Sequence, residues 1–489
     1  MKQSIFFHTC FFLLLATTGI SAQSISYSLP QKVSPAIGAI EIIGQTDNGL
    51  LVTEQEKNLF SISCFSSNLS LLWKKNLPLK NKNDLVQKIF LLSDSLLIFY
   101  TESDKSMTTL HATKISFRAE AGNRHVLLDT LSRSSFYAVP ELHFVAQPNS
   151  FSTLIYYEEN DFSSKKSFRY LLVDKNEKIV MARHYFVSSL QEPALCSTVI
   201  SVSNDLFFLF GENTAKNNNN DFPFEKLLLL TVSGSGKSTE VFIDNKETLI
   251  GYPTMKTDEI NQCVLISSLY SVSPGIESKG VLFFSKQIIG DSVLANKFIP
   301  FTSEFLLSIS GNSPPKKSDG FLHFKTKDII VRADGGIIFL AESVSISTES
   351  FNNQGYGNFG VSTSMTINYY HFDDVLVMSF SSNGELEWNQ VLRKRQQTEG
   401  DGGYYSSFNI SIGSGKLNFI FNDMVNGDVN VSEYIVTPDG IKDRHELFNA
   451  ERNGVMLIPR DGKQISLNET VMPSMVRNYF QLVKFTFDN

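Results

Sequence analysis

Short apolar runs separated by polar turns occur along the whole chain, and no long stretch has the spacing of an amphipathic helix. The runs are rich in Ile, Val, Leu, Phe and Tyr and are bounded by Asn, Gly, Asp or Ser, as strands and turns are. Asn-Gly or Asp-Gly pairs precede the runs that begin at Leu50, Ile337 and Val455. Such pairs supply the positive φ angles of tight hairpins. The pattern predicts an all-β chain.

One strand–turn–strand motif occurs twice and contains the only two tryptophans. Phe-Ser-Ser-Asn at residues 65–68 precedes Trp73, and the same four residues at 380–383 precede Trp388. Turn signals recur about every 50 to 60 residues, the length of a four-stranded blade. We therefore expect a single β-propeller of about seven or eight four-stranded blades. Trp73 and Trp388 are predicted to be structural wedges between blades.

An insertion interrupts the repeat at about residues 345–372. The stretch from Gly336 to Phe380 is 28 residues longer than the matching stretch from Gly49 to Phe65. Its centre is glycine-rich and carries aromatic side chains. It is interpreted as a flexible hairpin loop or as a recognition loop. In the second case Tyr356 and Phe359 are the candidate partner-binding residues.

The two ends of the chain carry different signals. Lys2, the apolar residues 5–16 and small residues up to Ala22 predict a signal peptide at 1–22, with an anchoring helix as the alternative. Residues 23–489 are then the propeller domain. The chain ends after about three strands of a blade. Residues 24–29 are expected to supply the fourth, so that the N- and C-terminal strands pair and close the ring.

Composition limits the classes of partner. The net charge of −7 argues against a nucleic-acid footprint, which needs a basic stripe. No segment after the signal is long and apolar enough to span a membrane. We expect buried thiols at Cys64, Cys196 and Cys263; the alternative is one disulfide among the three. We expect a protein exported to the periplasm, the outer surface or the medium.

The segment from Asn383 to Trp388, with its turn glycine four residues before the tryptophan, resembles the repeat of quinoprotein-like (PQQ-like) propellers. This resemblance implies an exported bacterial propeller with tryptophans packed between blades. The chain departs from the family in having only two tryptophans, with Leu69 in place of the first turn glycine. Enzymes of that family use adjacent cysteines and a cofactor pocket. No Cys-Cys pair occurs here, so no cofactor is expected.

Other candidate sites have weak patterns. Residues 233–239 resemble a phosphate loop but are followed by a strand-like run, so a hairpin turn is favoured. The histidines are scattered, and no metal site is predicted. The basic run at 393–395 is interpreted as a solvated strand end. No catalytic residues are assigned.

The function expected from these features is a non-enzymatic propeller that acts as a protein-interaction scaffold at the bacterial envelope or outside the cell. Its partner would be a protein, with a glycan as the other possibility. The alternative is a carbohydrate-binding or glycoside-processing propeller. That alternative requires acids and aromatic residues to converge on the central axis, for example around Glu54 or Glu342.

Overall fold

The computed structural model is almost entirely β. It describes residues 24–34, 37–57, 59–79, 81, 84–104, 107–120, 124–131, 139–148, 151–159, 167–213, 221–245, 248–272, 277–310, 323–353, 363–413, 415–425 and 428–487. These residues form strands β1–β35, one short α-helix, α1 (Ser303–Ile309), and one 3-10 helix, η1 (Pro459–Asp461). The predicted signal peptide at 1–22 lies outside the described residues. None of the helices within them is long and apolar enough to cross a membrane.

Strands that follow one another along the chain pair antiparallel, which builds sheets of consecutive hairpins. The first three sheets are β3 (Ile37–Thr46), β4 (Gly49–Glu56), β5 (Leu59–Phe65) and β6 (Leu71–Asn76); β7 (Leu85–Leu91), β8 (Leu96–Ser103), β9 (Thr108–Ile115) and β10 (His125–Leu131); and β11 (His143–Ala146), β12 (Ser152–Glu159), β13 (Ser167–Asp174) and β14 (Ile179–Phe186).

The middle of the chain forms a larger sheet, in which two four-stranded sets are joined through β19 (Leu249–Ile250). The sets are β15 (Pro193–Ile200), β16 (Leu206–Asn213), β17 (Phe224–Val232) and β18 (Ser238–Ile243), and then β20 (Thr254–Asp258), β21 (Cys263–Ser271), β22 (Gly280–Gln287) and β23 (Val293–Pro300). Residues 233–237 form the turn between β17 and β18, which confirms the hairpin and excludes the phosphate loop.

Three more sheets complete the described chain. They are β24 (Phe324–Val331), β25 (Ile337–Asn353), β26 (Thr363–Phe380) and β27 (Leu386–Leu392), with β28 (Gln397–Glu399) beside β26; β29 (Asn409–Gly413), β30 (Lys416–Val425), β31 (Asp428–Val436) and β32 (Lys442–Asn449); and β33 (Lys463–Gln464), β34 (Glu469–Val476) and β35 (Tyr479–Thr486), joined by β1 (Ser24–Tyr27) and β2 (Gln31–Lys32). The prediction of an all-β chain of four-stranded antiparallel sheets is confirmed.

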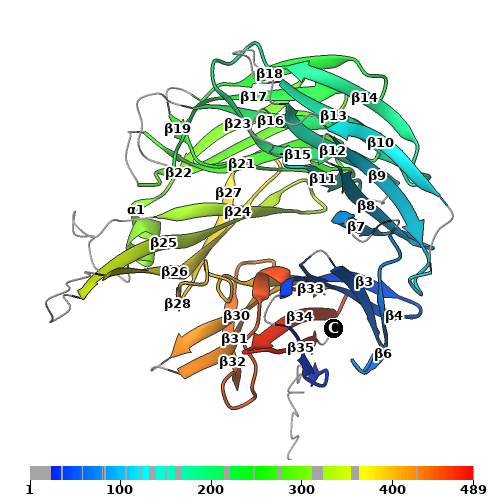
Figure 1. Cartoon of the computed structure of the whole chain (residues 1–489). Coiled ribbons are helices and arrows are strands. Elements are labelled where there is room, and N and C mark those ends of the chain that lie inside the picture. The colour runs from blue at the N-terminus through cyan, green and yellow to red at the C-terminus, as the bar shows by residue number, and fades with distance from the viewer. Residues whose placement is uncertain are drawn as a thin grey trace, which may run out of the picture.

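First strands of successive sheets contact one another. β3 contacts β7 and β34, β15 contacts β11 and β20, β20 contacts β24, and β29 contacts β33. The sheets therefore follow one another around a common axis that their first strands face, which is the arrangement of a β-propeller. Figure 1 shows this succession in the colours of the chain, from blue sheets through green and yellow to red.

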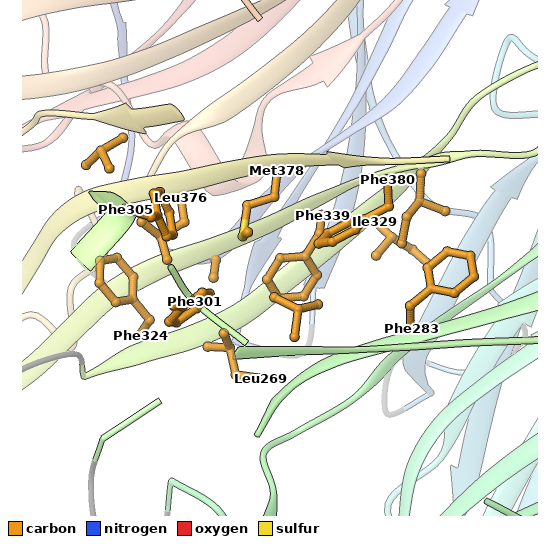
Figure 2. Close-up of a cluster of buried hydrophobic side chains, with 14 of the residues drawn as sticks. Leu269, Phe283, Phe301, Phe305, Phe324, Ile329, Phe339, Leu376, Met378 and Phe380 are labelled. Carbon is orange, nitrogen blue, oxygen red and sulfur yellow. The ribbon is translucent and has the colours of Figure 1, made fainter. Parts of the chain in front are cut away.

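Apolar side chains from facing sheets fill the space between neighbours. Figure 2 shows one such cluster, in which Phe283 of β22 lies beside Phe380 of β26, with their ring centroids 6.4 Å apart. Phe305 and Ile309 of α1 are buried in the same cluster. The short helix was not expected from the sequence. It forms because the Thr302 side chain caps its first turn, while Phe305 and Ile309 fall on one face.

Both tryptophans lie on the last strands of their sheets and are packed against clusters shared with the next sheet. Trp73 of β6 contacts the cluster between the first and second sheets, and Trp388 of β27 contacts the cluster between β24–β27 and β29–β32. The indole of Trp388 donates a hydrogen bond to the carbonyl of Pro438 at 2.8 Å. Gly440, at φ +80°, lets the chain pass so close that a Cβ would lie 2.7 Å from the indole.

The insertion is a long hairpin. β25 and β26 stay paired from Ile337↔Phe380 out to Asn353↔Thr363. The backbone hydrogen-bond ladder between β25 and β26 continues beyond the rest of the sheet. The segment that was interpreted as a loop is therefore largely regular strand, at residues 345–353 and 363–372. Tyr356 and Phe359 lie outside the described residues.

The N-terminal strand lies at the edge of the last sheet, beside β35. Ser24 pairs with Thr486 and Tyr27 with Val483. The Ser28 hydroxyl accepts a hydrogen bond from the Leu482 amide at 2.8 Å. Ile25 packs against the apolar cluster between the last two sheets. The first strand therefore covers a β35 edge that would otherwise present unpaired backbone groups.

Removing β1 should destabilise the protein. A variant that begins at residue 30 loses the pairing with β35 and the packing of Ile25, so its free energy of unfolding should fall by about 2 kcal/mol or more. The exposed edge should also promote concentration-dependent aggregation. Denaturant unfolding and light scattering measure both effects, with a variant that begins at residue 24 as the control. Equal stability of the two variants would show that β1 contributes nothing.

Candidate active site

Glu54 and Glu342, named from the sequence as possible axial acids, lie elsewhere. Glu54 is on β4 and Glu342 on β25, the second strands of their sheets. Glu54 accepts a hydrogen bond from Ser63 and forms an ion pair with Lys74 at 2.6 Å. Both partners of Glu54 lie in its own sheet, Ser63 on β5 and Lys74 on β6, so this acid is used in a polar contact within the sheet.

Glu342 is the centre of a buried network. Its side chain is fully buried, and Lys394 Nζ lies 2.8 Å from one carboxylate oxygen. Ser407 donates a hydrogen bond to the other oxygen at 2.8 Å, and Lys327 lies 3.2 Å from it. Burial would raise the pKa of Glu342, but the charges of Lys394 and Lys327 lower it overall. The network is therefore an ion pair that links the β24–β27 sheet to the segment leading to β29.

The interpretation of residues 393–395 as a solvated strand end is wrong for Lys394. Its side chain is 1% exposed. Besides the Glu342 ion pair, it donates to the Phe372 carbonyl and to Gln396 Oε1, both at 2.7 Å. A lysine is stable there because the acid and the two acceptors replace its hydration.

A cavity of about 390 Å³ lies between β3 and the segment from η1 to β33, both from the end of the series where the first and last sheets are in contact. It is lined by residues 39–42 of β3 and by residues 460–463, which run from η1 into β33. We call it the axial cavity. Its two walls come from the first and last sheets, and η1 contacts β3, β29, β30 and β34. In Figure 1 the orange-red η1 lies close to the blue β3 and to β33.

A proline and two side-chain hydrogen bonds hold the η1 wall of the cavity in place. Pro459 stands at the first position of the 3-10 turn, where its fixed φ favours a helical start. The Asn409 side-chain amide donates to the carbonyls of Pro459 at 3.1 Å and Gly462 at 2.9 Å. These bonds bracket the turn on both sides, so the two intervening charged residues are presented to the cavity.

Two acids, Glu41 and Asp461, and two cations, Arg460 and Lys463, line the axial cavity. Glu41 forms an ion pair with Lys88 of β7 at 2.6 Å. Lys463 donates to the Ile43 carbonyl at 2.7 Å. Asp461 and Arg460 complete the set. Three neighbouring sheets, the last, the first and the second, therefore meet in one charged site.

The surroundings of Asp461 shift the pKa of its carboxyl group. The Asp461 side chain is exposed to solvent, and partial desolvation by the protein around it raises its pKa. Arg460 opposes the rise, while the negative charge of Glu41 adds to it. Burial lowers the pKa of Lys463. A carboxyl whose pKa is raised is a candidate general acid when a second acid lines the same cavity.

Aromatic side chains border this site. The Arg460 guanidinium lies 4.5 Å from the ring centroid of Phe372, a cation–π contact that orients the arginine. Burial, with the charge of Asp461 next, raises the pKa of the Tyr404 phenol to about 12. Tyr404 is therefore a neutral donor near the acid.

None of these site residues was predicted from the sequence. Glu41 is one acid in an apolar strand, and Asp461 follows Arg460 in a short charged turn. They lie about 420 positions apart, and the contact between β3 and η1 brings them into one cavity. The one local signal was Pro459 before the charged turn, which marks a turn but not its partner.

No protein-family model matches the chain, and no curated protein matches it. Among solved structures, the polysaccharide lyase Uly1 matches over 94% of this chain and 100% of its own, at 9% identity and a TM-score of 0.40. Puromycin hydrolase matches over 81% of this chain at 9% identity and a TM-score of 0.38, and the Pyrococcus horikoshii acylaminoacyl peptidase over 93% at 7% and 0.36. The matches cover 53% and 58% of those two enzymes, so the chain spans little more than half of their length.

The prediction of a non-enzymatic protein-interaction scaffold is contradicted by these neighbours, which are propeller-type enzymes. The alternative, a carbohydrate-binding or glycoside-processing propeller, agrees better with them. All three TM-scores lie below 0.5, so the likeness is too distant to assign an activity to this chain. The choice of activity therefore rests on the residues of the axial cavity.

Breaking the buried ion pair should cost more than removing an exposed lysine. Lys394→Met leaves Glu342 buried without its nearest cation and should lower the free energy of unfolding by about 3 to 5 kcal/mol. Adding Glu342→Leu should recover part of that loss, because the uncompensated charge is then gone. Denaturant unfolding measures both. Lys416→Met, at an exposed position of β30, is the control. A Lys394→Met loss no larger than the control's would disprove the network.

A second buried acid gives a pH test. Glu433 of β31 is 3% exposed, one of its oxygens has no hydrogen-bond partner, and burial raises its pKa from 4.5 to about 7. The unfolded chain then loses this proton before the folded one, so stability should fall from pH 4.5 to pH 7 by about 3 kcal/mol and level off above. In Glu433→Gln this part of the fall should vanish, whereas the exposed Glu446→Gln should keep it. Identical pH profiles for Glu433→Gln and the parent would refute the assignment.

Proposed function

We propose that this protein is a glycoside-processing propeller whose active site is the axial cavity. One observation carries the proposal: two acids from the first and last sheets, Glu41 and Asp461, line the same cavity, and the pKa of Asp461 is raised. Glycoside hydrolysis commonly uses such a pair, one protonated and one ionised. The sequence alternative required acids and aromatic residues near the axis, and this site supplies both.

Each residue has a role in this reaction. The protonated Asp461 carboxyl donates its proton to the glycosidic oxygen as the bond to the sugar breaks. The Glu41 carboxylate, held by Lys88, removes a proton from the attacking water or forms the bond to the sugar itself. Tyr404 and Arg460 lie beside Asp461 and supply hydrogen-bond donors to sugar hydroxyls.

The cations define the substrate class. Arg460 and Lys463 both line the cavity and can pair with anionic groups, so the proposed substrate is a polysaccharide that carries carboxylate or sulfate groups. Arginine would bind such groups with two hydrogen bonds. Tyr356 and Phe359 in the insertion are proposed as further contacts to the sugar chain.

We also propose that the sheets are eight blades of one ring, closed by β1. The larger sheet counts as two blades in this assignment, and the contact between β3 and β34 supports closure. Export after removal of residues 1–22 is proposed from Lys2 and the apolar run that follows it. A polysaccharide substrate outside the cell would agree with export.

Polysaccharide cleavage tests the function directly. The purified protein should release reducing ends from uronate- or sulfate-bearing polysaccharides and not from neutral glucans. Asp461→Asn and Glu41→Gln should each lower kcat by about 100-fold or more, because each removes a proton-transfer group. Activity should also fall as the pH rises through the pKa of Asp461, since the acid must be protonated.

Matched controls separate chemistry from folding. Asp428→Asn and Glu225→Gln make the same atomic changes at exposed positions remote from the cavity and should leave the rate unchanged. Lys463→Met should raise KM more than it lowers kcat if this lysine binds substrate anions. Absence of cleavage on every polysaccharide, or full activity in Asp461→Asn, would reject the proposal.

A further inference from the structure

A second cavity, of about 420 Å³, lies between the β11–β14 sheet and the following set that begins with β15. We call it the side cavity. It shares no lining residue with the axial cavity. Neither the sequence patterns nor the proposed function assigns it a role. Its size is that of a pocket for a small molecule or for one or two peptide side chains.

Strand register brings its polar groups onto one face. His143 is opposite Tyr156, and Glu158 is opposite Phe168. Directly paired residues share a face, and positions two apart along a strand return to it. Tyr156 and Glu158 therefore point to the same side, together with their partners. Glu141 precedes His143 by two residues and also lines the cavity.

The floor of the side cavity is aromatic. Phe168 of β13 and Phe210 of β16 are each 3% exposed, and their ring centroids are 5.3 Å apart across the two sheets. Above them the ring of Tyr156 is stacked on His143 at 4.9 Å. Burial raises the pKa of the Tyr156 phenol, so the phenol is neutral. These rings present π faces and apolar surface to anything that enters.

The charges of the lining have one sign. Glu141 and Glu158 are exposed, and no described residue forms an ion pair with either. Among the residues that the structure describes, no lysine or arginine lines the cavity. Carboxylates at the mouth and aromatic rings below them both attract cations, the first by charge and the second through the ring quadrupole.

We propose that the side cavity binds an organic ammonium ion with an apolar body. The ammonium group would lie between Glu141 and Glu158, and the body would cover Phe168 and Phe210. A free amine and the lysine side chain of a peptide share this chemistry. Two acids and two cations line the axial cavity, so it lacks the excess of negative charge that the side cavity has.

Calorimetric titration with paired probes tests the site. The cation 2-phenylethylammonium should bind at least about tenfold more tightly than its neutral counterpart 2-phenylethanol, since a charge-assisted contact gives about that factor. Added salt should weaken the cation alone. A short peptide with one lysine, compared with the same peptide carrying norleucine, shows whether the source is a free amine or a side chain.

Variants locate the binding. The double variant Glu141→Gln/Glu158→Gln keeps size and removes charge, and should weaken amine binding by about tenfold or more. Val139→Arg at the exposed mouth places a cation in the site and should abolish it. Glu225→Gln is the matched control. Equal affinity for amine and alcohol, failure of both cations to bind, or unchanged binding in the double variant would overturn the proposal. Polysaccharide cleavage should be unaffected by these variants, so the two proposals fail separately.

Discussion

The packing of apolar faces between successive sheets is the interaction on which the rest of this structure depends. Each sheet has two faces to bury, so no sheet is satisfied until a neighbour covers it on each side. Phe283 against Phe380, and Phe168 against Phe210, are such contacts between neighbours. The contact between β3 and β34 and the pairing of β1 with β35 occur where the last sheet meets the first.

That same packing decides what each buried acid can do. Glu342 enters an interface with lysines and remains an ion pair, whereas Glu433 enters one without a cation, and its pKa rises to about 7. Asp461 is different because it lines a cavity and is exposed to water. Only in the last case can a raised pKa serve a reaction, since a substrate must touch the group. The shift in pKa alone would not have shown which of the three acids can take part in a reaction.

Much of the fold could be read from the sequence, because its signals are local. Alternating apolar runs, Asn-Gly turns and the two Trp motifs identify hairpins within about twenty residues, and β1 was placed by a missing fourth strand. The helix α1 was missed because its seven residues carry only one pair of buried positions. The insertion was misjudged as a loop because its strands extend past the sheet, where one hairpin partner suffices to maintain the ladder.

The candidate site could not be predicted in this way, because its residues lie far apart along the chain and no local pattern links them. Glu54 and Glu342 were preferred as acids beside clear strand signals, but those signals mark second strands. First strands here are short or irregular: β33 has two residues, and β3 carries bulges at Ile37/Ala39 and Ile42/Gly44. A bulge changes the direction in which the following side chains point, and it also interrupts the alternation of apolar and polar residues along the strand. The positions that present groups to the axis are therefore those where the pattern is least regular, and a functional residue in such a fold is best sought where the strand signal fails.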